Sequence, residues 1–362
     1  MKLFIICVFL SFNCLSQEND SLLFQIISNE NDTERVNLLY KAGFDLRNED
    51  PELSYKYAKI CEQEALKCNS IIHLAKSYNL LGVIFYKKGD YTKALQFQKK
   101  SLQLNKSINH EFGIAINHAN IGNIYSDLNY PKLAEISYLQ SLQSSNKTGN
   151  TLQITRCLIN IGTLKYNQKQ LQAAIKQFEE ALKYANIITN HELIGSCYNN
   201  IGTIMTEQNQ PDSALMYLEE GLKIRQLIDD KLELADSYNN IALVYILQKD
   251  FNKALNFIEL ANEICQEYNY PEALTELYHT RSVFYETQQN FEMANIWLKK
   301  HYYLKDSLQE IENENTNSQF FEGETVYKTE YFATKTQKNN WLLISLIIML
   351  IIIPLFLTQF KR

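Results

Sequence analysis

The sequence predicts an all-α solenoid, a fold in which one short helical unit is stacked many times. Two periodic patterns lead to this prediction. A glycine or another small residue recurs every 40 residues, and an alanine follows it twelve residues later in every unit. A single globular core does not produce such regular patterns, whereas stacked repeats do. The small residues are Gly82, Gly122, Gly162, Gly202, Ala242 and Ser282, and the alanines are Ala94, Ala134, Ala174, Ala214, Ala254 and Ala294.

Each unit is predicted to be two helices joined by a tight turn, as residues 196–224 illustrate. Apolar residues stand at helical spacing before a polar turn at 208–210, and a second amphipathic run follows the turn. Pro211 opens the second helix, where its missing N–H costs nothing. Gly202 and Ala214 flank the turn, so we expect their small side chains to let the two helices approach closely.

The pattern resembles the tetratricopeptide repeat (TPR), in a longer form of about 40 residues. Besides the glycine and the alanine, that family has a large or aromatic residue four positions before the glycine. The corresponding residues here are Tyr78, His118, Leu158, Tyr198, Tyr238 and Tyr278. The resemblance covers six units over residues 73–307 and implies a right-handed superhelix of antiparallel helix pairs.

An earlier, degenerate unit precedes these six and is expected to cap the array. Ala42 stands in its glycine position and Ser54 in its alanine position. With this unit the solenoid is predicted to cover residues 36–308 in about seven helix hairpins, because terminal repeats are commonly atypical.

The N-terminus predicts export from the cytoplasm. Residues 1–16 contain one basic residue, an apolar run and small residues before the expected cleavage site, which is typical of a secretory signal peptide. Residues 17–35 are then a lead-in to the repeats. Two alternatives stay open, namely lipoprotein processing at Cys14 and a buried N-terminal helix of a cytosolic protein.

The C-terminal part predicts a polar juxtamembrane stalk at 309–340 and one transmembrane helix at 341–358. The helix is almost uninterruptedly apolar, and with the residues up to 360 the stretch reaches twenty residues, or roughly 30 Å of helix, which matches a bilayer core. Lys361 and Arg362 lie in a short tail, 359–362, that is expected in the cytoplasm. Together with the signal peptide, this helix predicts a single-pass protein of the cytoplasmic (inner) membrane with its repeats on the periplasmic side.

Composition and motifs favour binding over catalysis. The net charge of −6 gives no support to nucleic-acid binding, which needs a basic face. The six histidines show no metal-ligand spacing, and no catalytic motif is present. We therefore expect neither an enzyme nor a cofactor or metal site. Cys157 and Cys197 occupy the same place in neighbouring units, which favours packed free thiols over a disulfide.

A third periodic pattern supplies the candidate binding site. Asparagines stand two positions before the glycine position, and two residues along a helix turn by about 200°. These amides therefore point away from the second helix of each unit, toward the expected inner surface. Three further asparagines, Asn79, Asn199 and Asn239, each stand one position earlier and widen this strip. The candidate residues are Asn79, Asn120, Asn160, Asn199, Asn200, Asn239 and Asn240.

Two interpretations of this asparagine strip stay open. In peptide-binding members of the family, asparagines at this position hold the main chain of the ligand, because an amide offers both a donor and an acceptor. Alternatively, the amides bond one another and only hold neighbouring repeats in register.

Two functions follow from the sequence. The first is a membrane-anchored module that binds a protein or peptide outside the cytoplasmic membrane. The second is a sensor receptor, because the predicted order of elements resembles the sensor half of bacterial TPR receptors that continue into a histidine kinase or a helix-turn-helix regulator. No output domain follows the predicted membrane helix, so such a receptor is expected to signal through a separate partner. The sequence indicates neither the ligand nor the oligomeric state.

Overall fold

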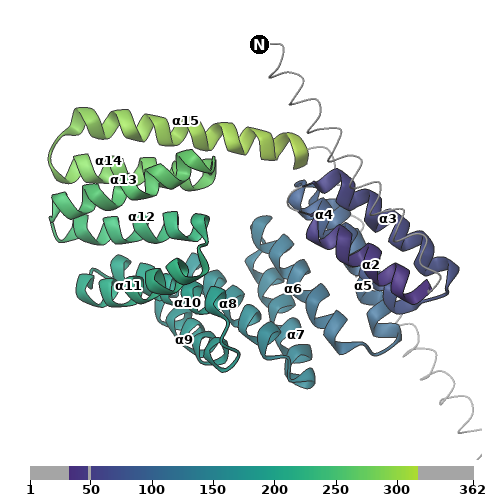
Figure 1. Ribbon diagram of the computed structural model, residues 1–362. Coiled ribbons are helices and arrows are strands. Elements are labelled where there is room, and N and C mark those ends of the chain that lie inside the picture. The colour runs from purple at the N-terminus through teal and green to yellow at the C-terminus, as the bar shows by residue number, and fades with distance from the viewer. Residues whose placement is uncertain (1–31, 48–49, 317–362) are drawn as a thin grey trace, which may run out of the picture.

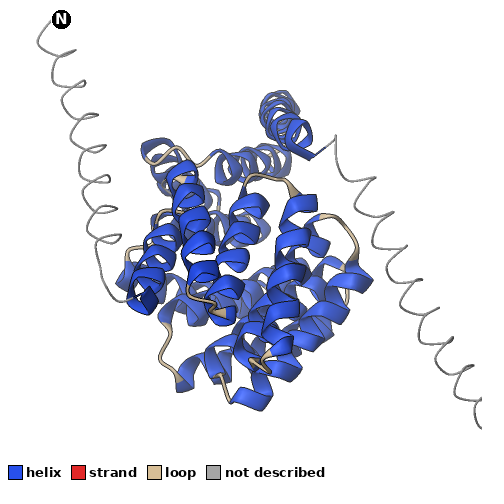
Figure 2. Ribbon diagram, turned by 90° about the vertical axis from the view of Figure 1, so that its right-hand side faces the viewer, coloured by secondary structure: helices blue, strands red, loops and turns tan. Residues whose placement is uncertain are grey.

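The computed structural model describes residues 32–47 and 50–316, with side chains as far as 309. These residues form 14 helices and no strand (Figures 1 and 2). The helices are α2 (Asp32–Asp45), α3 (Pro51–Lys67), α4 (Ile71–Lys87), α5 (Tyr91–Ser107), α6 (Glu111–Asp127), α7 (Pro131–Thr148), α8 (Thr151–Asn167), α9 (Leu171–Ile187), α10 (His191–Glu207), α11 (Pro211–Ile228), α12 (Lys231–Leu247), α13 (Phe251–Glu267), α14 (Pro271–Thr287) and α15 (Phe291–Thr316).

The helices form seven antiparallel pairs, which confirms the predicted solenoid. Each even-numbered helix packs most closely on the odd-numbered helix that follows it. Even-numbered helices also contact the next even-numbered helix along the array, from α2·α4 to α12·α14. The odd-numbered helices scarcely contact one another, so the array curves toward its even-numbered side (Figure 1). The even-numbered helices therefore form the inner layer of the superhelix.

A left-handed residue ends almost every helix and fixes the length of the repeat. The backbone φ is positive every 20 residues from 69 to 289, so most helices are 17 residues long and are followed by three connecting residues. The residue after the left-handed one returns a hydrogen bond to the last turn, as in His110 N–H to Asn105 O at 2.9 Å. The left-handed residues are Asn69, Gly89, Asn109, Asn129, Gly149, Lys169, Thr189, Asn209, Asp229, Lys249, Asn269 and Gln289.

The periodic glycines lie at the contact between the two helices of each pair, as predicted. A Cβ atom added to Gly162 would lie 2.8 Å from the ring of Phe178, and one added to Gly202 would lie 2.6 Å from Leu218. The periodic alanines, such as Ala174, are fully buried beside them. The close approach of the helices thus explains why this position excludes larger side chains.

The first pair departs from the predicted register by one residue. Gly43, and not Ala42, is buried against α3, where a Cβ atom would lie 3.1 Å from the Cβ of Tyr57. Its carbonyl oxygen accepts a hydrogen bond from the Ser54 hydroxyl at 2.6 Å. The assignment of Ala42 to the glycine position was therefore wrong, because the connection after α2 differs in length from the later ones.

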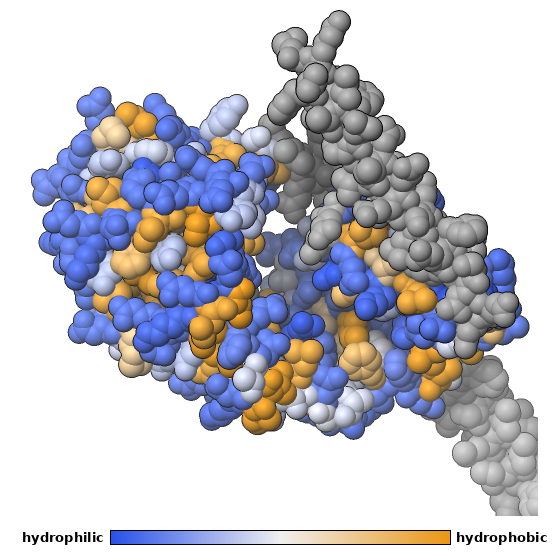
Figure 3. Space-filling model, in the orientation of Figure 1, coloured by the Kyte–Doolittle hydropathy of each residue, from blue (hydrophilic) through white to orange (hydrophobic). Residues whose placement is uncertain are grey.

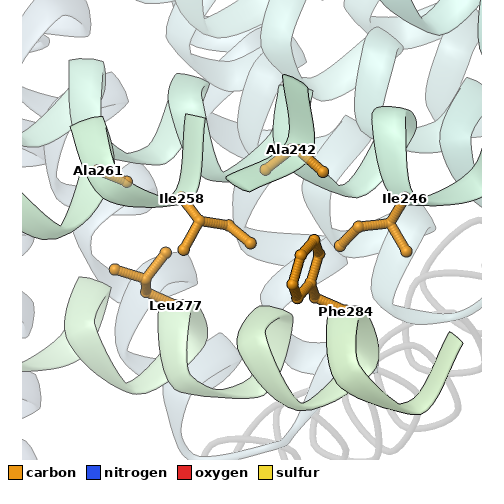
Figure 4. Close-up of a cluster of buried hydrophobic side chains, with 7 residues drawn as sticks. Ala242, Ile246, Ile258, Ala261, Leu277 and Phe284 are labelled. Atoms are coloured by element: carbon orange, nitrogen blue, oxygen red, sulfur yellow. The ribbon is translucent and has the colours of Figure 1, made fainter. Parts of the chain in front are cut away.

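The core runs along the solenoid as a chain of small clusters. Figure 4 shows one of them, in which Leu277 and Phe284 of α14 pack on Ile258 of α13 and Ile246 of α12. The second pair is different, because Gln98 fills the space beside Gly82. Gln98 accepts a hydrogen bond from Asn117 at 2.8 Å, so this junction is held by buried amides.

The ends of the solenoid differ slightly from the predicted boundaries. Helix α2 begins at Asp32, inside the predicted lead-in, and α15 continues to Thr316, inside the predicted stalk. Within the described ranges, no helix is long and apolar enough to span a bilayer. The predicted signal peptide at 1–16 and the predicted transmembrane helix at 341–358 both lie outside the described residues.

The five cysteines within the described part of the chain are free thiols. Cys157 and Cys197 are fully buried in neighbouring units, which confirms the packing predicted for them. Burial raises the pKa of the Cys197 thiol to about 12, so this side chain acts as a small apolar residue.

Candidate binding groove on the inner surface

Even-numbered helices line a cavity of about 600 Å³ on the inner side of the superhelix. Its walls come from α2, α4, α6, α8, α10 and α12, so it follows the array rather than one helix pair. Figure 3 shows the surface hollowed between the N-terminal helices and the C-terminal helices. We call this cavity and its continuation along the even-numbered helices the concave groove.

Three of the predicted asparagines, Asn79, Asn120 and Asn160, line the cavity. Asn199, Asn200, Asn239 and Asn240 occupy the equivalent positions on α10 and α12. All except the nearly buried Asn79 are partly exposed. The structure thus places the strip where the sequence predicts it, on the inner layer.

Amide–amide hydrogen bonds join neighbouring even-numbered helices across the groove floor. The Asn120 amide donates to Asn79 Oδ1 at 2.9 Å, and the Asn240 amide donates to Asn199 Oδ1 at 3.1 Å. The two residues of each pair are 41 positions apart, one repeat plus one residue. Part of the strip therefore holds the repeats in register, which is the second of the two interpretations left open.

Two of these interhelical bonds are missing, and the sequence explains why. The partner of Asn200 would be residue 159, which is Ile159, so Asn200 donates only to Ser196 of its own helix at 3.4 Å. The donor for Asn239 would be residue 280, which is Thr280, and Asn239 Oδ1 is buried without a hydrogen-bond partner. The side-chain amides of Asn200 and Asn239 therefore keep hydrogen-bonding groups that are not used between helices.

On α6, Asn123 replaces the missing acceptor for the amide of Asn160. Residue 119 is alanine, so Asn160 donates instead to Asn123 Oδ1 at 3.1 Å. Asn123 also accepts from the Tyr138 hydroxyl at 2.9 Å and lines the cavity. Sequence reasoning missed Asn123 because it lies one turn beyond the periodic positions.

Charged side chains of both signs line the cavity. Arg47 follows α2 and stacks on Phe44, with its guanidinium carbon 3.8 Å from the ring centroid. Arg156 of α8 is exposed and has no carboxylate partner within the described residues. Glu192 of α10 and Glu233 of α12 lie on the C-terminal side of the same cavity.

A buried arginine supports the acidic side. Arg225 of α11 is 3% exposed, pairs with Glu233 and donates to the Ser237 hydroxyl at 2.6 Å. Asp236, on the next turn of α12, has a pKa raised to about 6 by its own burial and then by the charge of Glu233, which Arg225 offsets only in part. Arg225 is thus one cation beside the two carboxyl groups of Glu233 and Asp236.

The described residues contain no group of histidine, cysteine and carboxylate side chains that could hold a metal. His118, in the large-residue position, is buried, and burial lowers its pKa to about 4. Its environment is that of a packed neutral ring.

Fold and groove together define a tetratricopeptide-repeat protein that presents an amide-lined inner surface. The chain belongs to the MalT-like TPR region family, whose model matches residues 79–328.

Among curated proteins, the chain is similar to ycf37 of Pyropia yezoensis, an uncharacterized protein. The two are 27% identical over 125 residues, which cover 29% of this chain and 67% of that protein.

Two solved structures share the fold. One is a Rap protein complexed with competence and sporulation factor, with a TM-score of 0.63 and 15% identity over 81% of either chain. The other is NprR in complex with its cognate peptide NprX, with a TM-score of 0.56 and 16% identity over 92% of this chain and 97% of NprR.

Proposed function

We propose that this protein is a non-enzymatic receptor that binds an extended peptide in the concave groove. The observation that carries the proposal is the strip of amides along the groove, where Asn200 and Asn239 keep unused hydrogen-bonding capacity. An extended main chain needs alternating donors and acceptors, which amides supply. The structures of NprR and the Rap protein, which share the fold, hold ligands named as a cognate peptide and as competence and sporulation factor.

We further propose that the receptor acts as a sensor through a separate signalling partner. The fold likeness to peptide-bound regulators favours this reading over a passive scaffold. Peptide binding would stabilise one curvature of the solenoid, and a partner that contacts the odd-numbered helices could respond to that change.

Site-specific photo-crosslinking in intact cells tests peptide binding. A photoreactive residue at Ser196, which lines the cavity, should form adducts of peptide mass. The same residue at Lys176, exposed on the outer helix α9, is the matched control and should not. Equal labelling at both positions, or none at Ser196, would contradict the proposal.

The proposed location is the cytoplasmic membrane with the repeats on its outer side. It rests on the sequence of residues 1–16 and 341–358. A reporter that is active only in the periplasm should work when fused near residue 320. A reporter that is active only in the cytoplasm should work after Arg362. The reverse pattern would place the repeats in the cytoplasm.

A further inference from the structure

One position on the inner layer changes charge along the array. It recurs every 40 residues on the even-numbered helices from α4 to α14, at residues that are partly or fully exposed. In chain order the residues at this position are Lys76, Ile116, Arg156, Ser196, Asp236 and Glu276. Three of these, Ile116, Arg156 and Ser196, line the cavity, which places the whole series along the groove.

The side chains around this series follow the same order of charge. Arg47 adds a second cation at the N-terminal end, and the pKa of Lys87 is lowered by burial and then by the nearby Arg47. At the C-terminal end, Glu192 and Glu233 line the cavity. The groove is thus basic from α2 to α8 and acidic from α10 to α14.

The charges that act on Asp236 are mostly negative. Burial first, and then Glu233, Glu276 and Asp230, raise the pKa of the Asp236 carboxyl, and the cation that opposes them is Arg225, which already pairs with Glu233. Asn239 Oδ1 lies one turn after Asp236 and is buried without a donor. Carboxylates beside an unfilled acceptor favour a ligand that carries N–H donors and positive charge. The carboxylates are Asp230, Glu233, Asp236 and Glu276.

The basic end has the opposite requirement. Arg156 is exposed to the cavity without an ion-pair partner among the described residues, although Glu192 lines the same cavity. Arg47 is held by stacking on Phe44 and by donating to the Phe44 carbonyl oxygen at 2.5 Å. Its charge therefore stays available to an anion, and a guanidinium suits a carboxylate well.

We propose that the concave groove binds its peptide in one direction, with the carboxylate end against Arg156, on the side where Arg47 adds positive charge, and the ammonium end against Glu233 and Asp236. This inference rests on the proposed function. Helix spacings of 8–10 Å put Arg156 and Asp236, two inner helices apart, roughly 16–20 Å from each other. About six residues of extended chain, at ~3.3 Å each, cover that span. The amides between the two ends would bond the main chain.

Pools of synthetic hexapeptides without charged side chains test the direction. The full-length protein is incubated with four pools, which have both ends free, only the N-terminus acetylated, only the C-terminus amidated, or both ends blocked. We expect the free pool to be retained best and each single block to weaken retention about fivefold to tenfold. Two further blocked pools carry one acidic residue near the C-terminus or one basic residue near the N-terminus, and they distinguish terminal charges from side-chain charges.

Charge variants assign each end of the peptide. Arg156→Glu should remove the preference for a free C-terminus and leave the preference for a free N-terminus. Asp236→Asn should do the opposite, and Glu233→Gln serves in its place if Asp236→Asn fails to fold. Lys176→Glu on the outer surface is the control and should change neither preference.

The possible outcomes separate this inference from the proposed function. Retention of peptides regardless of their end charges would leave peptide binding intact and overturn the direction. End preferences that the groove variants do not alter would overturn it as well. Retention of no pool at all would count against both.

Discussion

The two halves of the inner layer use the same repeat positions for different chemistry. From α4 to α8 the groove is basic and each inner helix is joined to the next by an amide bond. From α10 to α14 it is acidic, and although Asn240 donates to Asn199, Asn200 and Asn239 lack interhelical partners. The interior follows the same division. Asn105 and Arg225 occupy one position three units apart. Asn105 bonds to His110, the N-cap residue of α6, and Arg225 donates to Glu233 O in the first turn of α12.

This comparison separates what specifies the fold from what specifies the ligand. Positions that keep a small residue in both halves, the glycine position and the alanine position, lie at helix contacts and set the solenoid. Positions at which the two halves differ either face the groove or contact residues that face it. The departures from the repeat therefore mark the proposed binding chemistry.

The largest expected effect is the loss of the buried arginine in the C-terminal half. Arg225→Met removes the partner of Glu233 and the donor to Ser237, and it leaves Asp236 among uncompensated carboxylates. We expect the free energy of unfolding to fall by about 2–3 kcal/mol, measured by urea denaturation.

Asn105→Ala is the matched change in the N-terminal half. It removes the bond from the Asn105 amide to Asn117 at 2.8 Å but strands no charge, so a loss of about 1–2 kcal/mol is expected. Equal losses for Arg225→Met and Asn105→Ala would show that the two halves do not differ in the way the charges imply.

The second prediction concerns pH and applies to the acidic half. The raised pKa of Asp236, about 6 against a usual 3.8, means that the folded protein binds a proton where the unfolded chain has lost it. The contribution of Asp236 to stability therefore becomes less favourable as the pH rises from about 4 to 6 and stays so above that range. A bound ammonium group would favour the charged carboxylate and lower this pKa.

Affinity for a free-ended hexapeptide should consequently fall about tenfold from pH 7 to pH 5, measured by calorimetry. Asp230, Glu233 and Glu276 share the local potential, and Arg225 opposes it. In Asp236→Asn the slope should largely vanish, and an unchanged slope would assign the pH dependence to another group.

The third prediction compares a bonded amide with an open one. Asn120→Ala breaks the bond to Asn79 and should lower the free energy of unfolding by about 1 kcal/mol. Asn200→Ala breaks only a 3.4 Å contact within its own helix and should leave the thermal melt nearly unchanged.

The two variants should behave in the reverse order in peptide retention, because Asn200, unlike Asn120, has no interhelical amide partner and keeps hydrogen-bonding capacity for the peptide. If Asn200→Ala melts early and still retains peptide, the asparagine strip serves only to tie the repeats together.

Much of the fold could be predicted from the sequence, because each repeat position is constrained by the same contact. Gly162 and Gly202 meet a large side chain of the next helix, so their spacing alone indicated a helix pair. The first pair could not be placed correctly, since a connection of different length moves Gly43 into the position expected for Ala42. The left-handed turns also escaped the prediction, because Lys169, Thr189, Lys249 and Gln289 are not typical of that backbone conformation.

The location of the asparagine strip on the inner layer was predictable, but the hydrogen bonds within it were not. The 40-residue spacing placed the asparagines on the inner surface, whereas the bonds between them depend on residues 41 apart, such as Asn199 and Asn240. The charge order was overlooked because Arg156 and Asp236 look unremarkable in their own repeats. It emerges only when the inner helices are aligned side by side.

The prediction with the smallest expected effect tests whether the turns of the two halves have the same backbone conformation. Lys169 and Lys249 both adopt positive φ, at 60° and 59°, in the turns before α9 and α13. Non-glycine residues are strained there, so Lys169→Gly and Lys249→Gly should each raise the free energy of unfolding by about 0.5–1 kcal/mol. Gly89→Lys, at a φ of 74°, is the reverse change and should lower it by a similar amount.

Equal gains at Lys169 and Lys249 are expected at high salt, because both turns have the same backbone geometry, neither side chain lines the groove cavity, and salt screens the exposed ion pair of Lys169 with Glu207. Unequal gains in urea denaturation under those conditions would mean that the halves differ in their backbone as well as in their side chains. In that case the repeats of the two halves would differ in structure. Arg156 and Asp236 could then no longer be treated as the same position of the repeat.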